Sequence, residues 1–417
     1  MGKTNIAVVA FLLLAVLGSV QCYVCEGTIN NIPIRTIRPV LNKTVPHGQK
    51  YTIDNNGELM QIINITGNAF QMGKAYGQLM SDEIHAIVNA YFHYVEEHAE
   101  EELKLITKLP KWLQPSAKKA TVQVLRWILR FNGLVTRKYT TIRFQAELDG
   151  IAEGANIDRN ALVEINMIPE YTKAGCSILG AWGNATINGD LLHLRALDWD
   201  TNAPLNNYPI VVVYHSNEKG SQPFANVGWA GFVGSITGFS PVVGVGEKVR
   251  KQNTNENETR LGKPWNYAIR DVMQFATNID EALQMLNETD RTCSIYLGIG
   301  SKVNNTFRLV EYSHKEFTVY DDHNFPYTSK HGQFDHVVYM PIHDDNSECF
   351  NDLIRENYGR IDSEWIMRVL APLHKTGDTQ LAVYNYRNME LLLQYSRGGV
   401  YAYNRTPLRI DLAPFLV

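Results

Sequence analysis

Cys176 and the residues that follow it form the stretch of this chain best suited to do chemistry, AGCSILGAWGNATINGDLLHLRALDWD from Ala174 to Asp200. A cysteine attacks carbonyl carbon as a thiolate, so it needs a base or a lowered pKa. Gly175 has no side chain that would block an attack by the Cys176 thiol on the Gly175 carbonyl. Such an attack would cut the chain before Cys176. The freed α-amino group, with an ordinary pKa of about 7.7–8.0, can then serve as a general base. The alternative is an inert buried thiol.

The segment GDLLHLRALDW reads as a strand that returns beside Cys176. With a period of two, His193 and Arg195 share one face, and Asp198 lies on the other. Arg195 and Asp198 can therefore both reach the thiol only through a bulge or at the end of the strand. Arg195 would keep a thiolate charged, and Asp198 would accept a hydrogen bond from an α-amino group.

Two segments together resemble a known family. "GCS…LHLRALDWD" followed by "VGWAGFVGSITGFSPVVGVGEKVR" is similar to the N-terminal-nucleophile amidases, and among them to acid ceramidase, N-acylethanolamine acid amidase and the penicillin acyltransferase-like peptidases. The family pattern is a nucleophilic Cys, an Arg-x-x-Asp on the returning strand, and a G-x-x-T-G-F segment that leads to an acidic residue. The upstream segments 67–84 and ELDGIAEGANI also resemble the family's α part. The matching residues are Cys176, Arg195, Asp198, Gly234, Thr237, Gly238, Phe239 and Glu247.

The resemblance implies an α+β fold, an αββα sandwich preceded by a helical α part. It implies cleavage between Gly175 and Cys176 into an α part (23–175) and a β part (176–417). These follow a signal peptide (1–22), which the N-terminal residues indicate. Cys176 would be the nucleophile and, through its amine, the base, while Arg195, Asp198 and Glu247 orient it and balance its charge. The family's disulfide between subunits matches Cys25 and Cys349, which leaves Cys293 unpaired.

One departure concerns the oxyanion. The family carries an Asn in a TNH or TNY motif that helps to stabilise it, whereas the corresponding region here reads QFDHVVYMPIHDDN. His336, His343 and Asn346 are the candidate substitutes, and Arg355 is a candidate for a downstream family arginine. Loss of one oxyanion donor costs roughly 100- to 1,000-fold in rate.

The N-terminus indicates the secretory pathway. MGKTNIAVVAFLLLAVLGSVQC has an early lysine, a short apolar run and then small residues, which is typical of a signal peptide and short for a membrane span. An uncleaved anchor is the alternative. We therefore expect a lysosomal or extracellular protein with N-glycans on exposed sequons. The candidate acceptors are Asn42, Asn64, Asn184, Asn257, Asn287, Asn304 and Asn404.

The surrounding elements change in character near Gly175. Before it, apolar residues at helical spacing predict helices over 81–106, 116–131 and 141–157. After it, alternating or continuous apolar runs predict strands, with helices between them. The predicted strands are 191–199, 208–215, 241–249, 293–301, 306–313 and 381–386, and the predicted helices are 266–276, 279–288 and 363–372.

A basic stretch stands out before the candidate site. No Asp or Glu occurs from Leu103 to Ala146, where Leu109, Trp112, Leu113, Trp127, Ile128 and Phe131 are interleaved with ten bases. This pattern is typical of contact with an anionic membrane surface. The alternative is an ordinary helix pair with apolar residues in the core. The bases are Lys104, Lys108, Lys111, Lys118, Lys119, Arg126, Arg130, Arg137, Lys138 and Arg143.

Other functions lack a signal. A net charge of −4 over 417 residues argues against a nucleic-acid binder. The histidines show no metal-ligand spacing, there is no G-x-S-x-G elbow, and we expect neither metal nor cofactor. The sequence therefore predicts an amidohydrolase acting on an N-acyl bond, plausibly of a lipid amide. The alternatives are an acyltransferase, a phospholipase-B-like esterase, or an uncleaved glycoprotein that only binds.

Overall fold

The computed structural model describes residues 25–102, 111, 113–171, 174–250, 258–328, 330–342 and 347–416. Several expectations lie outside these ranges and are not addressed further. They are the signal peptide 1–22, the sequon at Asn257, the residues Lys104, Lys108, Leu109 and Trp112 of the basic stretch, and the oxyanion candidates His343 and Asn346.

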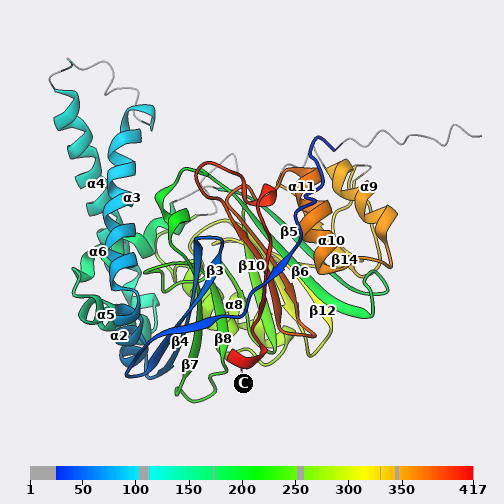
Figure 1. The fold of residues 1–417 in the computed structure, drawn as a ribbon, viewed down its shortest axis with the longest axis horizontal. Helices are drawn as coiled ribbons and strands as arrows, with labels where there is room; N and C mark the ends of the chain where they lie inside the picture. The colour runs from blue at the N-terminus through cyan, green and yellow to red at the C-terminus, as the bar shows by residue number, and fades with distance from the viewer. Residues whose placement is uncertain are drawn as a thin grey trace, which may run out of the picture.

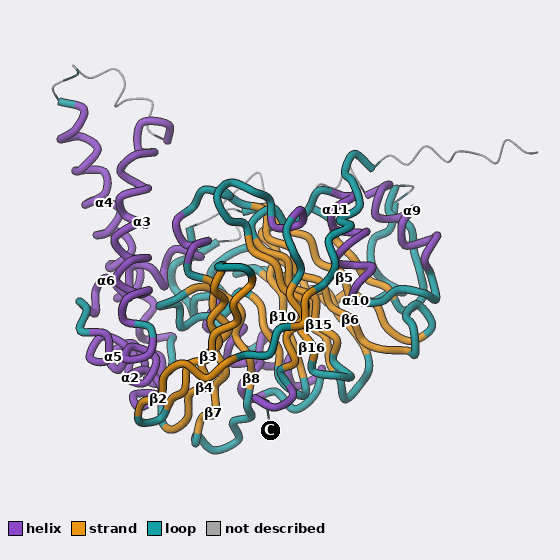
Figure 2. The backbone as a smooth tube through the Cα atoms, in the orientation of Figure 1, coloured by secondary structure: helices purple, strands orange, loops and turns teal. Residues whose placement is uncertain are grey.

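Within the described ranges, the strands build two sheets that face each other (Figures 1 and 2). The first is seven-stranded, in the order β1-β17-β16-β15-β6-β5-β14. Its central strands are buried on both faces, so they appear in the sequence as continuous apolar runs. Its members are β1 (Arg35–Thr36), β5 (Gly175–Gly183), β6 (Gly189–Asp198), β14 (Val337–Met340), β15 (Gln380–Asn385), β16 (Glu390–Tyr395) and β17 (Leu408–Asp411).

The second sheet has ten strands, in the order β13-β12-β11-β10-β9-β8-β7-β4-β3-β2. It is antiparallel except where β4 pairs parallel with β7, Gln61 opposite Ile210. Its members are β2 (Val40–Val45), β3 (Gly48–Asn55), β4 (Glu58–Gly67), β7 (Pro209–Ser216), β8 (Phe224–Trp229), β9 (Thr237–Phe239), β10 (Val243–Val249), β11 (Ile295–Ser301), β12 (Thr306–Tyr312) and β13 (Phe317–Tyr320).

Helices cover the outer faces of both sheets, which makes the αββα sandwich that we expected. Helices α7 (Trp265–Phe275) and α8 (Ile279–Asn287) pack on β8–β11, and α2 (Ala69–Leu79) packs on β2–β4. On the seven-stranded sheet lie α9 (Ser347–Asn357), α10 (Ser363–Trp365), a π-helical turn (Ile366–Leu370) and α11 (Ala371–His374). The remaining described helices are α3 (Ser81–Glu102), α4 (Gln114–Thr136), α5 (Ile142–Ala155) and α6 (Arg159–Met167).

The part of the chain before Gly175 is not only helical. Strands β2–β4 precede its helices and extend the ten-stranded sheet, and β1 pairs with β17 in the other sheet. A hairpin signal was present in the sequence, because Asn56 and Gly57 between β3 and β4 both have positive φ (59° and 88°), as a type I′ turn requires. Both halves of the chain therefore contribute strands to the same sheets.

The upstream segments that resemble the family's α part have a packing role. Gly73 of α2 and Gly150 of α5 lie where the two helices approach closely. A Cβ on Gly73 would lie 2.1 Å from the Glu147 carbonyl oxygen. A Cβ on Gly150 would lie 2.3 Å from the Phe70 carbonyl oxygen. These glycines let two backbones touch, and they lie away from the candidate site.

Helices α3 and α4 project from the body of the molecule, at the upper left of Figure 1. The outer face of α4 exposes Val124, Trp127, Phe131 and Leu134, and the rings of Trp127 and Phe131 stack with centroids 5.4 Å apart. Among the described residues, no helix combines the length and the apolarity that a bilayer span requires.

Candidate active site

Cys176 lies at the start of β5, in the interior of the sandwich. The register places Cys176 opposite Leu197 of β6 and Gly175 opposite Asp198. Its side chain is fully buried and faces β10 of the other sheet, as does the side chain of Arg195, two residues before Leu197. Gly175 and Cys176 are consecutive residues of β5.

Arg195 joins the thiol to Glu247 of β10. Its Nη2 lies 3.7 Å from Cys176 Sγ and 3.2 Å from Glu247 Oε2, and its Nε donates to the Glu247 carbonyl at 3.2 Å. Nη1 donates to Gln380 Oε1 on β15 at 3.1 Å. The guanidinium and the Glu247 carboxylate are both buried, so this is an ion pair in a low-dielectric interior. Three strands fix the arginine beside the sulfur.

Gly246 makes this arrangement sterically possible. A Cβ there would lie 3.0 Å from Arg195 Cγ and 2.9 Å from His193 Nε2. The glycine thus leaves room for the arginine to pass β10 and reach Glu247. Thr237 and Gly238 of the family-like segment form β9 and brace β10 from the side, the Thr237 hydroxyl donating to the Val245 carbonyl at 3.1 Å.

The Cys176 thiol is protonated in the uncleaved chain. Burial raises its pKa from 9.0 to about 12, an effect that the nearby Arg195 guanidinium only partly offsets. Burial also raises the pKa of the Glu247 carboxyl, again against the opposing effect of Arg195. A thiol in this state needs a proton acceptor before it can act as a nucleophile.

Asp198 points away from the sulfur. Strand β6 runs to Asp198 with no bulge at this end, so the alternation holds and its carboxylate leaves on the opposite face from Arg195. It accepts hydrogen bonds from the Thr376 hydroxyl (2.8 Å) and from the amides of Gly377 (2.7 Å) and Asp378 (3.2 Å). Burial, followed by the nearby Asp378 carboxylate, raises its pKa to about 7. In this structure Asp198 anchors the loop before β15.

His193 shares the face of Arg195 but is not a base for the thiol. It lies deeper between the sheets, where Nδ1 is 3.1 Å from the Tyr386 hydroxyl. Burial lowers its pKa to about 3, so the ring is neutral.

Lys248 is a site residue that the sequence reasoning missed. Its ammonium group donates to the Cys176 carbonyl oxygen at 2.9 Å, and its side chain is buried. A signal existed, because Gly244, Gly246 and Lys248 alternate along β10 and all face the other sheet. A lysine on that face must be buried between the two sheets.

An apolar pocket opens beside this group. It encloses about 490 Å³, counting the space at its opening, and Arg195 and Glu247 lie in its wall. Glu247 Oε1 is buried and accepts no hydrogen bond from the described residues. The other lining residues come from both halves of the chain: Ile168, Pro169, Ala174, Leu197, Trp199, Leu205, Trp229, Phe232, Ile236, Val249 and Trp265.

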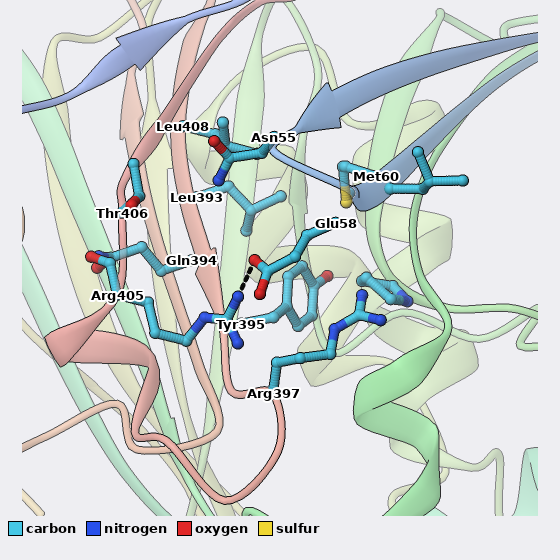
Figure 3. A pocket seen from close by; sticks show the side chains of 12 residues that line it. Asn55, Glu58, Met60, Leu393, Gln394, Tyr395, Arg397, Arg405, Thr406 and Leu408 are labelled. Carbon is cyan, nitrogen blue, oxygen red and sulfur yellow. Dashed lines mark hydrogen bonds and ion pairs between the residues drawn. The ribbon is translucent and has the colours of Figure 1, made fainter.

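A second pocket, shown in Figure 3, lies between β4, β16 and β17 and is more polar. Its wall carries the Glu58–Arg405 ion pair and the guanidinium of Arg397. Tyr395 lines it and accepts a hydrogen bond from Gln380 Nε2 at 2.9 Å, the same Gln380 that contacts Arg195. The second pocket therefore lies behind the arginine, on the far side of Tyr395.

Two further candidates from the sequence, His336 for the oxyanion asparagine and Arg355 for the downstream family arginine, lie outside the site. His336 stands beside Gly183, at the other end of β5, seven residues or roughly 23 Å along the strand from Cys176. Arg355 is exposed on α9 and pairs with Asp352 at 2.8 Å. Neither candidate is therefore at the site. Ile342, just after β14, does lie there, since a Cβ on Gly175 would be 2.5 Å from its Cδ1.

The expected disulfide between Cys25 and Cys349 is present, and Cys293 is a buried free thiol. Of the described sequons, Asn42, Asn184, Asn287, Asn304 and Asn404 are exposed, whereas Asn64 is half-buried on β4 between β3 and β7. The described residues hold no group of three His, Cys, Asp or Glu side chains placed to bind a metal.

Comparison with known proteins gives two relatives. Protein dcd1A of Dictyostelium discoideum is 35% identical over 420 residues, covering 94% of this chain and 93% of that protein. Protein dcd1B of the same organism is 32% identical over 364 residues, covering 85% of this chain and 72% of that protein. No family model matches the chain.

Two solved structures are partly similar. An N-acylethanolamine-hydrolyzing acid amidase ortholog of Caenorhabditis elegans has a TM-score of 0.38 and 17% identity, covering 56% of this chain and 98% of its own. Penicillin V acylase from Agrobacterium tumefaciens has a TM-score of 0.38 and 11% identity, covering 57% of this chain and 86% of its own.

Proposed function

This chain belongs to the family of the Dictyostelium dcd1 proteins, and we propose that it is a self-cleaving cysteine amidohydrolase whose active centre forms at Cys176. One observation carries the proposal. A buried thiol directly follows a glycine at the start of a strand, with a buried guanidinium 3.7 Å from its sulfur. A merely structural cysteine does not need a buried arginine whose charge Glu247 must balance.

Maturation begins when the Cys176 sulfur attacks the Gly175 carbonyl carbon. The carbon–nitrogen bond breaks, the thiol proton passes to the departing nitrogen, and Gly175 is held as a thioester. Water then cleaves the thioester, which leaves a carboxyl group on Gly175, the free thiol, and a new α-amino group on Cys176.

Turnover repeats this chemistry on a substrate. The α-amino group takes the thiol proton, and the thiolate attacks the amide carbonyl carbon. The amide carbon–nitrogen bond breaks, the leaving amine takes the proton, and the acyl group stays on sulfur. Water then releases the carboxylic acid and restores the thiol. Arg195 favours the thiolate, because an adjacent opposite charge stabilises the ionised form.

The substrate we propose is an amide with an apolar acyl group, plausibly a lipid amide. The pocket beside Arg195 and Glu247 is lined by aromatic and aliphatic side chains, which suits a hydrocarbon chain. Glu247 Oε1, buried and without a donor among the described residues, can accept a hydrogen bond from the substrate's amide N–H. Ala174 lines the pocket, so the end of the α part stands at its wall before cleavage.

The test is to express the full chain, incubate it at acid and neutral pH, and identify new N-termini by mass spectrometry. We expect a fragment that begins CSILG, and hydrolysis of at least one member of a panel of N-acylethanolamines, ceramides and lysophospholipids. Cys176→Ala should remain one chain and be inactive, while Cys293→Ala, which removes the other buried thiol, should cleave normally. A single intact chain that turns over substrate at full rate would contradict the proposal and leave a binding protein or an unrelated mechanism.

The compartment and the surface contact complete the proposal. The signal-peptide pattern and the sequons support passage through the secretory pathway to a lysosome or the exterior. The exposed apolar stripe on α4, with Lys119, Arg137 and Lys138 exposed on the same helix or just after it, supports contact with an anionic lipid surface that presents substrate. Arg126 and Arg130 have a different role, because both pair with the buried Glu164 of α6.

A further inference from the structure

Lys248 is a buried cation that contacts the main chain of Cys176. Its Nζ donates to the Cys176 carbonyl oxygen at 2.9 Å. Strand β14 pairs with β5 only from Ile178 onward, so it does not reach Cys176. The ammonium group therefore holds the first residue of the mature chain on the side that β14 leaves unpaired.

After cleavage, the Lys248 charge would also act on the new α-amino group of Cys176. The nitrogen and the carbonyl oxygen of one residue are separated by fixed bonds, so a cation on the Cys176 carbonyl stands within about 5 Å of the freed α-amino nitrogen. A positive charge at that distance disfavours protonation of the amine. A base that must accept the thiol proton at acid pH has to be unprotonated there.

Among the described residues, the charged groups that face Cys176 come from two strands. Arg195 on β6 and Lys248 on β10 are cationic, and Glu247 on β10 is the carboxylate that pairs with Arg195. Asp198 at the end of β6 is turned toward residues 376–378, with Asp378 beside it. The Glu247 charge is engaged by Arg195, so the effect of Lys248 on a neighbouring amine is not cancelled by that carboxylate.

We propose that Lys248 is a positioning residue for the mature enzyme, one that anchors residue 176 by its carbonyl and keeps the new α-amino group a free base. The proposal rests on the proposed function, because it needs the amine that cleavage creates. It assigns Lys248 to turnover and not to cleavage, since the scissile carbonyl belongs to Gly175 whereas Lys248 contacts that of Cys176.

The experiment compares pH–rate profiles of kcat/KM for wild type, Lys248→Arg, Lys248→Gln and Lys248→Met, using p-nitrophenyl octanoate and subtracting the Cys176→Ala background. All four should cleave before Cys176. Removal of the Lys248 charge raises the pKa of the α-amino group. The acid limb of the pH–rate profile should therefore shift to higher pH in the Gln and Met variants. Coulomb's law at about 5 Å and an effective dielectric constant of about 20 puts the shift at about two pH units. Lys248→Arg should keep the wild-type limb.

Controls separate the possible failures. Lys302→Met removes an exposed lysine and should change nothing. If wild type does not cleave, the proposed function fails and this inference with it. If wild type cleaves but the Gln and Met variants keep its acid limb, only this inference is overturned, and Lys248 is a structural hydrogen-bond donor. A Lys248→Met variant that melts like wild type but stays uncleaved also overturns it, in favour of a role in cleavage. Should Met impair folding, the Gln variant, which keeps a donor without charge, decides the question.

Discussion

At the scale of single residues, burial sets the protonation of the groups around Cys176. The thiol of Cys176, the carboxyl of Asp198 and the carboxyl of Glu170 all have raised pKa values because they are removed from water. Glu170 lies six residues before Cys176. It accepts a hydrogen bond from the Trp265 amide at 2.9 Å and lies 3.5 Å from the Arg260 guanidinium. Its pKa is raised to about 7.

This carboxyl should make the fold more stable in acid. The folded pKa of Glu170 is about 7 against an ordinary 4.5, so between these values the folded chain binds a proton that the unfolded chain has lost. Stability from this group therefore rises as the pH falls from about 7 to about 4.5. Glu170→Gln should lessen the difference between the melting temperatures at about pH 5 and about pH 8. The exposed Glu288→Gln should leave that difference as in wild type, and an unchanged difference in Glu170→Gln would refute the argument.

At the scale of elements, a buried ion pair joins the two halves of the chain. Arg270 of α7 and Glu147 of α5 make two parallel contacts of 3.0 and 2.6 Å, and both side chains are buried. Arg270 also lies over the ring of Tyr214, 4.1 Å from its centroid. Since α5 precedes Cys176 and α7 follows it, the proposed cleavage would leave this pair joining the two parts.

Removal of one partner of the Arg270–Glu147 ion pair should lower the free energy of unfolding. Glu147→Gln leaves the Arg270 charge buried and uncompensated, which typically costs about 3–5 kcal/mol. The loss in free energy of unfolding can be measured by chemical denaturation, with each substitution made in the uncleaved Cys176→Ala chain. The matched control on the same helix is Glu153→Gln, which breaks the exposed pair with Lys74 and should cost less than about 1 kcal/mol. A Glu147→Met/Arg270→Met double variant should be more stable than Glu147→Gln, because no charge remains buried, and equal losses in all three variants would rule out the ion-pair explanation.

At the scale of the whole molecule, the αββα body and the α3–α4 projection have different surfaces (Figure 1). The body buries its apolar residues between the sheets and under the outer helices, whereas α4 exposes a continuous apolar stripe. Such a stripe with exposed bases nearby fits the plane of a membrane surface.

Trp127→Ala/Phe131→Ala should therefore weaken binding to vesicles rich in anionic phospholipid at least about tenfold, because two large interfacial side chains are lost. Flotation with vesicles at low and high salt measures the fraction of protein that is bound. The control, Val303→Ala/Tyr401→Ala, removes exposed apolar side chains of the body and should bind as wild type does. Equal binding by both double variants, or binding that ignores salt and lipid charge, would argue against a membrane role for α4.

The sequence alone determined the local elements and the chemistry of the central stretch. Period-two and helical spacing located β6, β10, β15, α5 and α7 to within a few residues, because these patterns reflect which face of each element is buried. The Gly175–Cys176 pair and Arg195 were also evident, since their roles depend on neighbours along the chain. The Cys25–Cys349 bond was foreseen only through the resemblance, and the structure contains it.

Tertiary structure decided which side chains meet. It brought Lys248 and Gln380 to Cys176 and Arg195, turned Asp198 toward residues 376–378, and built the apolar pocket from both halves of the chain. These contacts depend on how the two sheets stack and on the pairing of β6 with β15, which joins Arg195 to Gln380 across 185 residues of sequence. A local pattern gives the face of each strand, but not which strand of the other sheet that face meets.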